Sequence, residues 1–391
     1  MFAGMSNVFI IVITIFAFQT GHLCLPDNGT VRNPAASYIN YPEQGGAIEL
    51  PVRGATGWAA SKMPLRVKPE QGADVVLLLS PGQGFTIIKE QGDWWNVRIG
   101  GYGGISGWVP HSGCFINLPD VIPSLVFDIT NAYSSSMRSM GHEIPDITGY
   151  ALYEAWAFNR RLDRHEFIVP ALYATSKRIF AAQQAALADG NTIIIYEAFR
   201  PRETQQRVVD NLRRLMDANA EVRNAINSPP WGLGWFISTG VSNHQRGVAI
   251  DVGLGRIVAS EIRASGAYAY THVTAFERHE MPTPIHELSP QAATFTRPVS
   301  SSSACAWRNA VLARGMTEGA VLLQHYLTDT GFTPLASEWW HFNDLDGARA
   351  ANEIGITGGF FTDSLYSETP TRRKAPSVRF AHWQWVHATK Y

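Results

Sequence analysis

Three separated segments of this 391-residue chain carry side chains that could bind a metal ion or stabilise a charge beside it. In the first segment, residues 242–251 (SNHQRGVAID), His244 lies seven residues before Asp251. Gly247 permits a tight turn, and the apolar residues after it predict a strand that returns Asp251 to the side of His244. An imidazole and a carboxylate are both zinc ligands, and a third protein ligand would leave one coordination position open for water.

The second segment, residues 338–341 (EWWH), supplies a second imidazole and a carboxylate three residues before it. A zinc ion lowers the pKa of a water molecule that it binds toward about 7, so a neighbouring carboxylate can accept the proton at neutral pH. We therefore expect His341 to be the third ligand of one zinc ion and Glu338 to act as the catalytic base.

The third segment, residues 196–201 (YEAFRP), follows an apolar run and ends in an arginine before a proline. An arginine fixed at the end of a strand can stabilise an oxyanion that develops in a neighbouring site, and this is the role that we expect for Arg200. Each segment alone also has an ordinary structural explanation, such as packed aromatic rings or the start of a helix. The 12 histidines of the chain include four rival ligands, His272, His279, His286 and His325.

The elements that must position these segments mix helix and strand after the first third of the chain. Apolar residues at helical spacing predict helices over residues 170–189, 204–226 and 308–330. The run TIIIY at residues 192–196 predicts a buried strand shortly before Arg200. Single strands between helices, with no internal repeat, indicate an α+β fold.

An earlier part of the chain, residues 50–118, has a different pattern of short apolar runs separated by glycine turns. Five short strands at this spacing predict a small all-β barrel. A glycine turn precedes Trp94 and Trp95, which fill one strand, and Trp108 lies in the last strand. The predicted strands cover residues 64–67, 75–79, 85–88, 94–99 and 107–109.

The charge and cysteine content exclude several classes of protein. Lys and Arg total 32 and Asp and Glu total 33, so the net charge of −1 argues against a nucleic-acid binder or a polybasic membrane-surface protein. Hydrophobic residues make up 45% of the chain and charged residues 17%, which argues against long disordered stretches. Three cysteines cannot build a disulfide scaffold or an all-cysteine zinc site, although Cys114 and Cys305 could pair in an oxidising compartment.

The amino terminus predicts export. Residues 8–18 (VFIIVITIFAF) form an apolar run of 11 residues. This run is shorter than a membrane span of about 20 residues but typical of a secretory signal. We therefore predict a signal peptide over residues 1–24, a linker over residues 25–49, and a secreted or periplasmic protein with no stable membrane span after signal removal. A buried amino-terminal helix is the alternative interpretation.

The three segments, in this order, resemble the zinc D-Ala-D-Ala metallopeptidases, and in particular the VanX-type D-alanyl-D-alanine dipeptidases. The resemblance covers about residues 127–343. It implies a Hedgehog/D,D-peptidase-like fold, which we expect over residues 119–366, with one Zn²⁺ ion and a D-Ala-containing peptide or peptidoglycan as the substrate.

Carried over position by position, the resemblance implies the same three zinc ligands as the spacing does. It makes Glu338 the catalytic base and acid, and Arg200 the clamp on the transition state. Ser242 and Tyr133 correspond in position to residues of the substrate pocket.

This chain departs from the dipeptidase pattern at a position that matters for the substrate. The dipeptidases have a Met-Gly-Thr-x-Phe-Asp stretch whose aspartate helps to read the free amine of the substrate, whereas residues 281–287 are MPTPIHE here. His286 stands in the place of that aspartate and Glu287 follows it, so both are candidate substrate-binding residues. The last two ligands are 90 residues apart, which leaves room for extra loops over residues 266–274 or 289–306 that reshape the cleft.

Residues 50–118 resemble a bacterial SH3-like domain, through the stretches LRV at 65–67, GDWWNVR at 92–98 and GWV at 107–109. Such domains often bind cell-wall peptides, and a packing module built on core tryptophans is the alternative. The tail, residues 367–391, is either docked or an interaction segment. For the whole chain, the alternatives to a dipeptidase are a D,D-carboxypeptidase or endopeptidase acting on muropeptides, and a catalytically silent cell-wall-binding protein.

Overall fold

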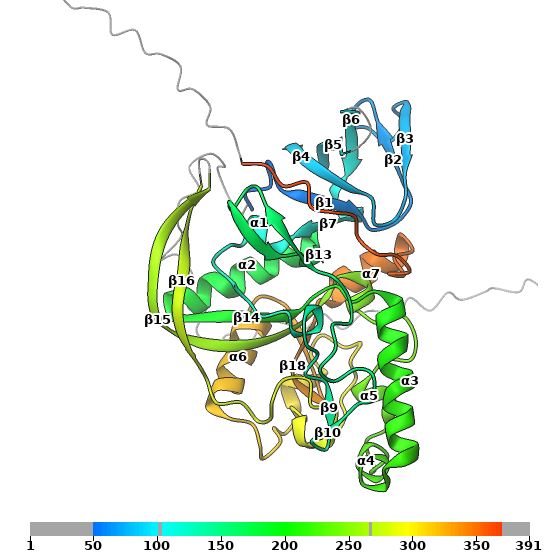
Figure 1. Ribbon diagram of the computed structural model, residues 1–391, viewed down its shortest axis with the longest axis vertical. Coiled ribbons are helices and arrows are strands. Elements are labelled where there is room, and N and C mark those ends of the chain that lie inside the picture. The colour runs from blue at the N-terminus through cyan, green and yellow to red at the C-terminus, as the bar shows by residue number, and fades with distance from the viewer. Residues whose placement is uncertain (1–49, 101–103, 266–267, 370–391) are drawn as a thin grey trace, which may run out of the picture. The chain divides into compact units, whose positions relative to one another are not determined.

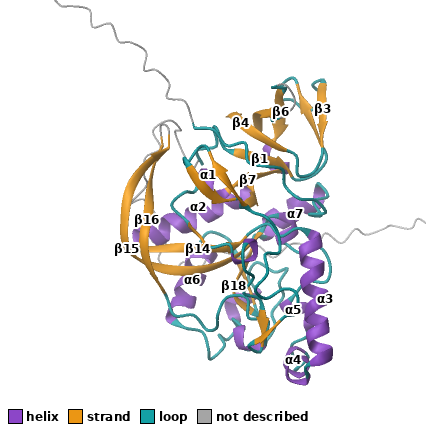
Figure 2. Cartoon of the chain, in the orientation of Figure 1, coloured by secondary structure: helices purple, strands orange, loops and turns teal. Residues whose placement is uncertain are grey.

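The computed structural model describes residues 50–100, 104–265 and 268–369 (Figure 1). The predicted signal peptide, the predicted linker and residues 370–391 of the tail lie outside the described residues. No helix among the described residues is long and apolar enough to span a membrane. The described chain contains helices, two large β-sheets and two short hairpins (Figure 2).

The first sheet has eight strands in the order β13-β7-β1-β4-β5-β6-β2-β3. Their bounds are β1 (Thr56–Ala59), β2 (Met63–Arg66), β3 (Val75–Leu79), β4 (Gly84–Gln91), β5 (Trp94–Ile99), β6 (Ser106–Pro110), β7 (Cys114–Asn117) and β13 (Pro170–Leu172). The five strands predicted within residues 50–118 are all present, as β2 to β6. The helix predicted from residue 170 begins instead at Tyr173, because residues 170–172 pair with β7 and extend this sheet beyond residue 118.

Aromatic rings form much of the core of the first sheet. The side chains of β5 alternate, so that Trp95 is fully buried while Trp94 is only half-buried. Trp58 and Phe85 are fully buried as well. A Cβ atom on Gly57 would lie 2.5 Å from the Phe85 ring, so this close approach requires glycine. Trp58 and Trp95 therefore stabilise the sheet by packing.

The described end of the tail lies along the first sheet. The side chain of Asp363 accepts a hydrogen bond from the backbone nitrogen of Gly84 at 3.0 Å, and the backbone nitrogen of Glu368 donates to the carbonyl of Gly54 at 2.7 Å. Between them, Ser367 donates to Asp120 at 2.6 Å. The first residues of the predicted tail are therefore docked.

The thiol of Cys114, in this sheet, decides whether the pairing with Cys305 can form. Cys114, at the start of β7, is fully buried and is not part of a disulfide. A disulfide between Cys114 and Cys305 therefore does not form. Burial also raises the pKa of the Cys114 thiol, which keeps it protonated and unreactive.

The second sheet carries the predicted site. It runs in the order β17-β18-β15-β14-β8, and β16 pairs with β15. The bounds are β8 (Val126–Phe127), β14 (Asn191–Glu197), β15 (Ala249–Ser265), β16 (Tyr268–Arg278), β17 (Thr333–Leu335) and β18 (Glu338–Asn343). The buried strand predicted over residues 192–196 is β14. The loop expected over residues 266–274 is wrong for residues 268–274, which belong to β16 of the long hairpin seen in Figure 2.

Helices lie between these strands in sequence. They are α1 (Leu118–Val121), α2 (Tyr173–Ala188), α3 (Arg202–Ala218), α4 (Ala220–Ile226), α5 (Leu233–Phe236), α6 (Glu318–Thr328) and α7 (Leu345–Glu353). The helix predicted over residues 204–226 is interrupted at Asn219, whose side chain caps α4. The helix predicted over residues 308–330 is wrong before residue 318, because the side chain of Thr317 caps a helix that begins there.

Two short hairpins complete the described elements. One pairs β9 (Arg138–Ser139) with β10 (His142–Glu143), and the other pairs β11 (Trp156–Asn159) with β12 (Arg164–Phe167). The first hairpin lies beside the segment that contains His286, because the backbone nitrogen of Arg138 donates to the carbonyl of His286 at 3.1 Å. It therefore contributes to the surroundings of the predicted site.

Candidate metal centre and active site

Strand pairing brings the three predicted segments together. Asp251 lies directly opposite His341 in the pairing of β15 with β18, and opposite Glu197 in the pairing of β15 with β14. His244 begins a single 3₁₀ turn that ends just before β15. Residues that are distant in sequence therefore meet at one place on the second sheet.

Gly247 allows that turn, as the sequence predicted. Its φ of 65° lies in the left-handed region that favours glycine. A Cβ atom at this position would also lie 2.7 Å from the Phe115 ring of the first sheet. Both the backbone conformation and the close packing therefore require glycine between His244 and Asp251.

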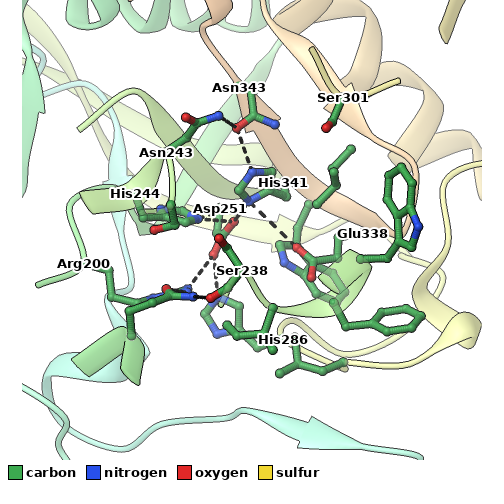
Figure 3. A pocket seen from close by; sticks show the side chains of 18 of the residues that line it. Arg200, Ser238, Asn243, His244, Asp251, His286, Ser301, Glu338, His341 and Asn343 are labelled. Atoms are coloured by element: carbon green, nitrogen blue, oxygen red, sulfur yellow. Dashed lines mark hydrogen bonds and ion pairs between the residues drawn. The ribbon is translucent and has the colours of Figure 1, made fainter. Parts of the chain in front are cut away.

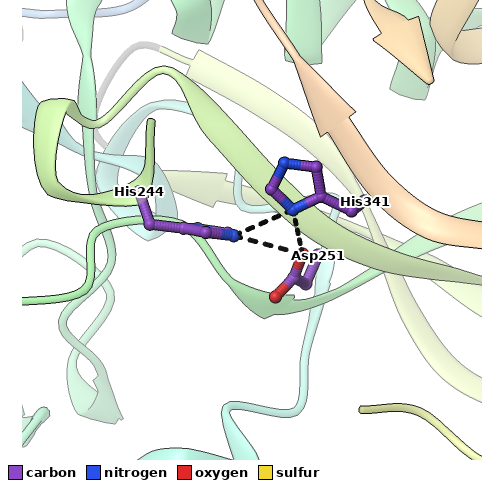
Figure 4. A group of neighbouring side chains, drawn as sticks. All are labelled: His244, Asp251 and His341. Carbon is purple, nitrogen blue, oxygen red and sulfur yellow. Dashed lines mark hydrogen bonds and ion pairs between the residues drawn. The ribbon is translucent and has the colours of Figure 1, made fainter. Parts of the chain in front are cut away.

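Three potential ligand atoms converge at this place (Figure 4). The Nε2 atom of His244 lies 3.1 Å from Nδ1 of His341 and 3.2 Å from Oδ1 of Asp251. The Nδ1 atom of His341 lies 3.0 Å from the same carboxylate oxygen. All three side chains are buried.

The outer nitrogens of both imidazoles face oxygen atoms. The Nδ1 atom of His244 lies 2.7 Å from the carbonyl of Ala198, and Nε2 of His341 lies 3.0 Å from Oδ1 of Asn343. That amide oxygen also accepts a hydrogen bond from Asn243 at 2.8 Å. We assign the imidazole hydrogens to these outer nitrogens from their partners.

This assignment decides what the inner atoms can bind. Both inner nitrogens then carry lone pairs, and they face a carboxylate oxygen that is also a lone-pair donor. Three lone-pair donors repel one another unless a cation lies between them. Metal-binding histidines characteristically donate their other N–H group to an oxygen. Two imidazoles and one carboxylate fit Zn²⁺ with a fourth position open.

The second oxygen of Asp251 has partners of its own. Its Oδ2 atom lies 3.1 Å from Nε2 of His286 and 3.4 Å from Nη2 of Arg200. Burial opposes the ionisation of Asp251, but the interactions with His244, His286 and His341 outweigh it and hold the pKa of Asp251 well below its usual range. The carboxylate is therefore ionised, as a metal ligand must be.

Arg200 is held in place by a buried network. Its Nε donates to Glu197 at 2.9 Å, its Nη2 also contacts that carboxylate, and its Nη1 donates to Gln205 at 2.9 Å. The other oxygen of Glu197 accepts hydrogen bonds from Asn131 and Tyr153, both at 2.9 Å. Burial disfavours the charge of Glu197, but Arg200 outweighs it and lowers the pKa of Glu197. The guanidinium is thus fixed beside Asp251.

Glu338 occupies the opposite kind of environment. It begins β18, is only 6% exposed, and its Oε2 lies 3.8 Å from Nδ1 of His341. Burial raises the pKa of Glu338 to about 8, an effect that His341 only partly offsets. A carboxylate with a raised pKa beside a metal site is well suited to accept and return a proton near neutral pH.

A cavity of about 320 Å³ opens onto this cluster (Figure 3). The three ligand residues, Glu338, Arg200, Ser242 and His286 line it. The cavity is also lined by residues that could not be predicted, including Trp235, Ser238 and Ser301, because their segments carry no recognisable motif. Among the described residues that line the cavity, Asp251 and Glu338 are the only acidic ones.

The four candidate substrate-binding residues have different positions. Ser242 lines the cavity, whereas Tyr133 is 52% exposed, hydrogen-bonds to Asp128 and is not among the lining residues. His286 is 1% exposed and contacts Asp251. Glu287 lies outside the cavity lining, and its carboxylate accepts hydrogen bonds from the backbone nitrogens of residues 140 and 141.

The rival ligands are separated by their positions. Among the described residues, His286 is the one rival that falls in a group able to hold a metal, with Glu197 and Asp251. The guanidinium of Arg200 already lies on both of those carboxylates, so their charge is compensated without a metal ion. In the His244–Asp251–His341 group, Arg200 contacts only Oδ2 of Asp251, whereas Oδ1 faces the two imidazoles. This group is therefore the better metal site.

Comparison with known proteins finds a distant relative. No family model matches the chain. The chain is 29% identical over 198 residues to the D-alanyl-D-alanine dipeptidase of Escherichia coli (strain K12), a match that covers 50% of this chain and 72% of that protein. This distant similarity to a hydrolase of peptides, together with histidine and aspartate groups that can bind a metal, supports a peptidase-like role for the protein.

Proposed function

We propose that the protein is a zinc-dependent D-alanyl-D-alanine dipeptidase, which hydrolyses D-alanyl-D-alanine or related D-Ala-containing peptides. The observation that carries the proposal is the convergence of His244, Asp251 and His341 with both outer imidazole nitrogens on oxygen atoms. The distant similarity to a dipeptidase supplies the substrate class.

The residues of the cavity divide the work of hydrolysis between them. His244, Asp251 and His341 would hold the zinc ion, which when bound would activate water and polarise the scissile carbonyl. Glu338 accepts the proton of the attacking water on its carboxylate and returns it to the leaving amine. Arg200 stabilises the developing oxyanion, and its contacts with Glu197 and Gln205 fix the guanidinium in advance, so that no reorganisation is needed during the reaction.

A second candidate is a D,D-carboxypeptidase or endopeptidase that cleaves longer muropeptides. The observation that favours it is the acidic content of the cavity, where Asp251 and Glu338 are the only carboxylates among the described lining residues. Both are committed to the metal and to proton transfer. A free substrate ammonium would therefore find no further carboxylate, whereas an acylated amine needs none.

We also propose the setting in which the enzyme works. The proposal comprises a Hedgehog/D,D-peptidase-like fold over residues 119–366, an SH3-like domain over residues 50–118 that holds the enzyme near cell-wall peptides, and export to the cell surface or periplasm. A catalytically silent wall-binding protein is disfavoured because all three ligands and Glu338 are present.

One experiment tests the choice between these functions. The purified chain is loaded with zinc, its zinc content is measured, and release of D-alanine is followed from D-alanyl-D-alanine and from an N-acylated peptide that ends in D-Ala-D-Ala. Release from the free dipeptide, lost in Glu338→Ala, supports the dipeptidase. Release from the acylated peptide alone supports the second candidate, and protein that binds no zinc overturns both.

A further inference from the structure

His286 approaches Asp251 from the side away from the other two ligands. Its Nε2 atom faces Oδ2 of Asp251 at 3.1 Å, while Oδ1 faces His244 and His341 (Figure 3). A carboxylate oxygen can only accept, so the hydrogen of this contact belongs to the imidazole. His286 therefore donates to the oxygen that does not face the proposed metal.

The backbone around His286 is built to turn its ring inward. Its φ of 61° lies in the left-handed region, which few residues with a side chain adopt. Hydrogen bonds hold the segment on both sides of it. Arg138 donates to the carbonyl of His286 at 3.1 Å, and Leu288 donates to the carbonyl of Arg138 at 2.7 Å. Backbone strain that is maintained in this way is typical of functional positions.

The side chain of Glu287 also holds this segment against the hairpin of β9 and β10. Its Oε1 accepts a hydrogen bond from the backbone nitrogen of Met140 at 2.5 Å, and its Oε2 accepts one from Gly141 at 3.2 Å. The side chains of His286 and Glu287 therefore serve different partners. The glutamate fixes the hairpin of β9 and β10, and the histidine reaches the metal centre.

His286 lines the cavity, but the one hydrogen bond of its side chain within the described chain is made to a proposed metal ligand. The side chain is 1% exposed, and Nδ1 has no hydrogen-bond partner among the described residues. The only described polar group to which the ring is bonded is Asp251. The remaining contact on Oδ2 is Arg200, which at 3.4 Å is longer than the contact of His286.

We propose that His286 is a positioning residue that holds Asp251 as a one-oxygen ligand. By occupying Oδ2, its N–H group keeps the carboxylate from turning both oxygens toward the ion, and so preserves four-coordination with one open position. The proposal rests on the metal binding of the proposed function, but not on the identity of the substrate.

Replacing His286 by asparagine or by glutamine separates the length of the side chain from its ability to donate a hydrogen bond. Asparagine tolerates a positive φ better than other residues with a side chain, but its short amide cannot extend as far as Nε2 of histidine. Glutamine carries an N–H donor on a longer side chain that can extend that far. The matched control is His279→Asn, because His279 contacts Asn191 rather than a proposed ligand.

The readouts are the zinc dissociation constant, from competition with a chromophoric chelator, and the visible spectrum of the Co²⁺-loaded full chain. We expect His286→Asn to raise the dissociation constant about 10- to 100-fold, as loss of an outer-shell partner does. Its cobalt absorption should weaken as the coordination number rises. His286→Gln should recover most of the affinity and the wild-type spectrum, and His279→Asn should change neither.

The outcomes separate this inference from the proposed function. If the wild-type chain binds no zinc, the proposed function itself fails. If the wild-type chain binds zinc and His286→Asn matches it in affinity and in cobalt spectrum, the positioning role alone is overturned. Thermal unfolding of the metal-free variants checks that they fold. If His286→Asn unfolds, His286→Gln is compared with Asp251→Ala instead. A zinc affinity of His286→Gln as weak as that of Asp251→Ala overturns the proposal, because an N–H donor that reaches Asp251 would then not restore zinc binding.

Discussion

The first sheet and the candidate metal centre bury their side chains in different ways. In the first sheet, the largest buried groups are rings such as Trp58 and Trp95, which gain stability simply by leaving water. Around the candidate metal centre the buried groups include Glu197, Asp251 and Arg200, whose charges are costly to bury unless each has partners. The difference shows where the chain gives up stability to keep chemistry in place.

The largest effect should follow from removing the carboxylate of Glu338. We expect Glu338→Gln to lower kcat by about 10²- to 10⁴-fold, the usual contribution of a general acid–base group. The zinc dissociation constant should remain close to that of the wild type, because Glu338 is not one of the three converging ligands. Steady-state kinetics and chelator competition measure the two quantities. Glu353→Gln, on the exposed side of α7, is the control, and a variant that keeps wild-type kcat would remove Glu338 from the mechanism.

The first sheet should respond to mutation in stability alone. We expect Trp95→Ala to lower the free energy of unfolding by about 3–5 kcal/mol, because it leaves a large cavity in an apolar core. Trp94→Ala, on the half-buried face of the same strand, should cost less. Denaturant titration measures both. A Trp95→Ala protein that stays as stable as the wild type but loses zinc affinity would contradict the division between the two regions.

A smaller effect should appear in the pH dependence of the metal-free protein. Burial raises the pKa of Glu338 to about 8, above its value in the unfolded chain, so the folded state binds the proton more tightly. The stabilising contribution is therefore present in full at acidic pH and is lost as the pH rises toward 8.

The comparison of variants isolates this contribution. Between pH 5 and pH 8, wild-type protein without metal should lose more stability than Glu338→Gln, which cannot ionise. Denaturant midpoints across that range measure the difference. Parallel curves for the two proteins would show that Glu338 is not protonated in the folded state, and added zinc should flatten the wild-type curve because a cation favours the carboxylate.

The smallest effect should come from Tyr133, which the sequence placed in the substrate pocket. Because Tyr133 is half exposed and bonded to Asp128 outside the cavity, we expect Tyr133→Phe to change kcat/KM by no more than about twofold, the scale of an ordinary surface substitution. Steady-state measurement of kcat/KM on whichever peptide the wild-type protein hydrolyses tests this. A tenfold fall in kcat/KM would place the ring in contact with substrate after all.

Much of the candidate site could be predicted because His244 and Asp251 lie at a fixed spacing in the sequence. The spacing of His244, Gly247 and Asp251 encodes a turn followed by a strand, and the structure has both. The pairing register that places His341 opposite Asp251 could be expected only if both residues were assumed to belong to one site. Strand pairing depends on tertiary context, which the local sequence does not encode.

The remaining features depend on contacts that local patterns do not encode. Glu197 ends an apolar strand, and an acid in such a strand was the available signal for a buried partner of Arg200. The inward direction of His286 depends on a left-handed backbone held by a distant hairpin. Likewise, residues 170–172 have a helical pattern but join a sheet because β7 lies beside them.

The docked carboxyl-terminal segment has a consequence for how the chain matures. The hydroxyl of Thr56 bonds to Ser367, 311 positions later, and the indole of Trp58 donates to the carbonyl of Asp363 at 3.1 Å. Contacts between such distant positions form late, because a long loop must close first. Most of the first sheet is synthesised early, but these hydrogen bonds can form only after the carboxyl-terminal segment has been synthesised. A ribosome stalled before residue 363 would hold that sheet without these hydrogen bonds, exposed to the folding and quality-control factors of the cell.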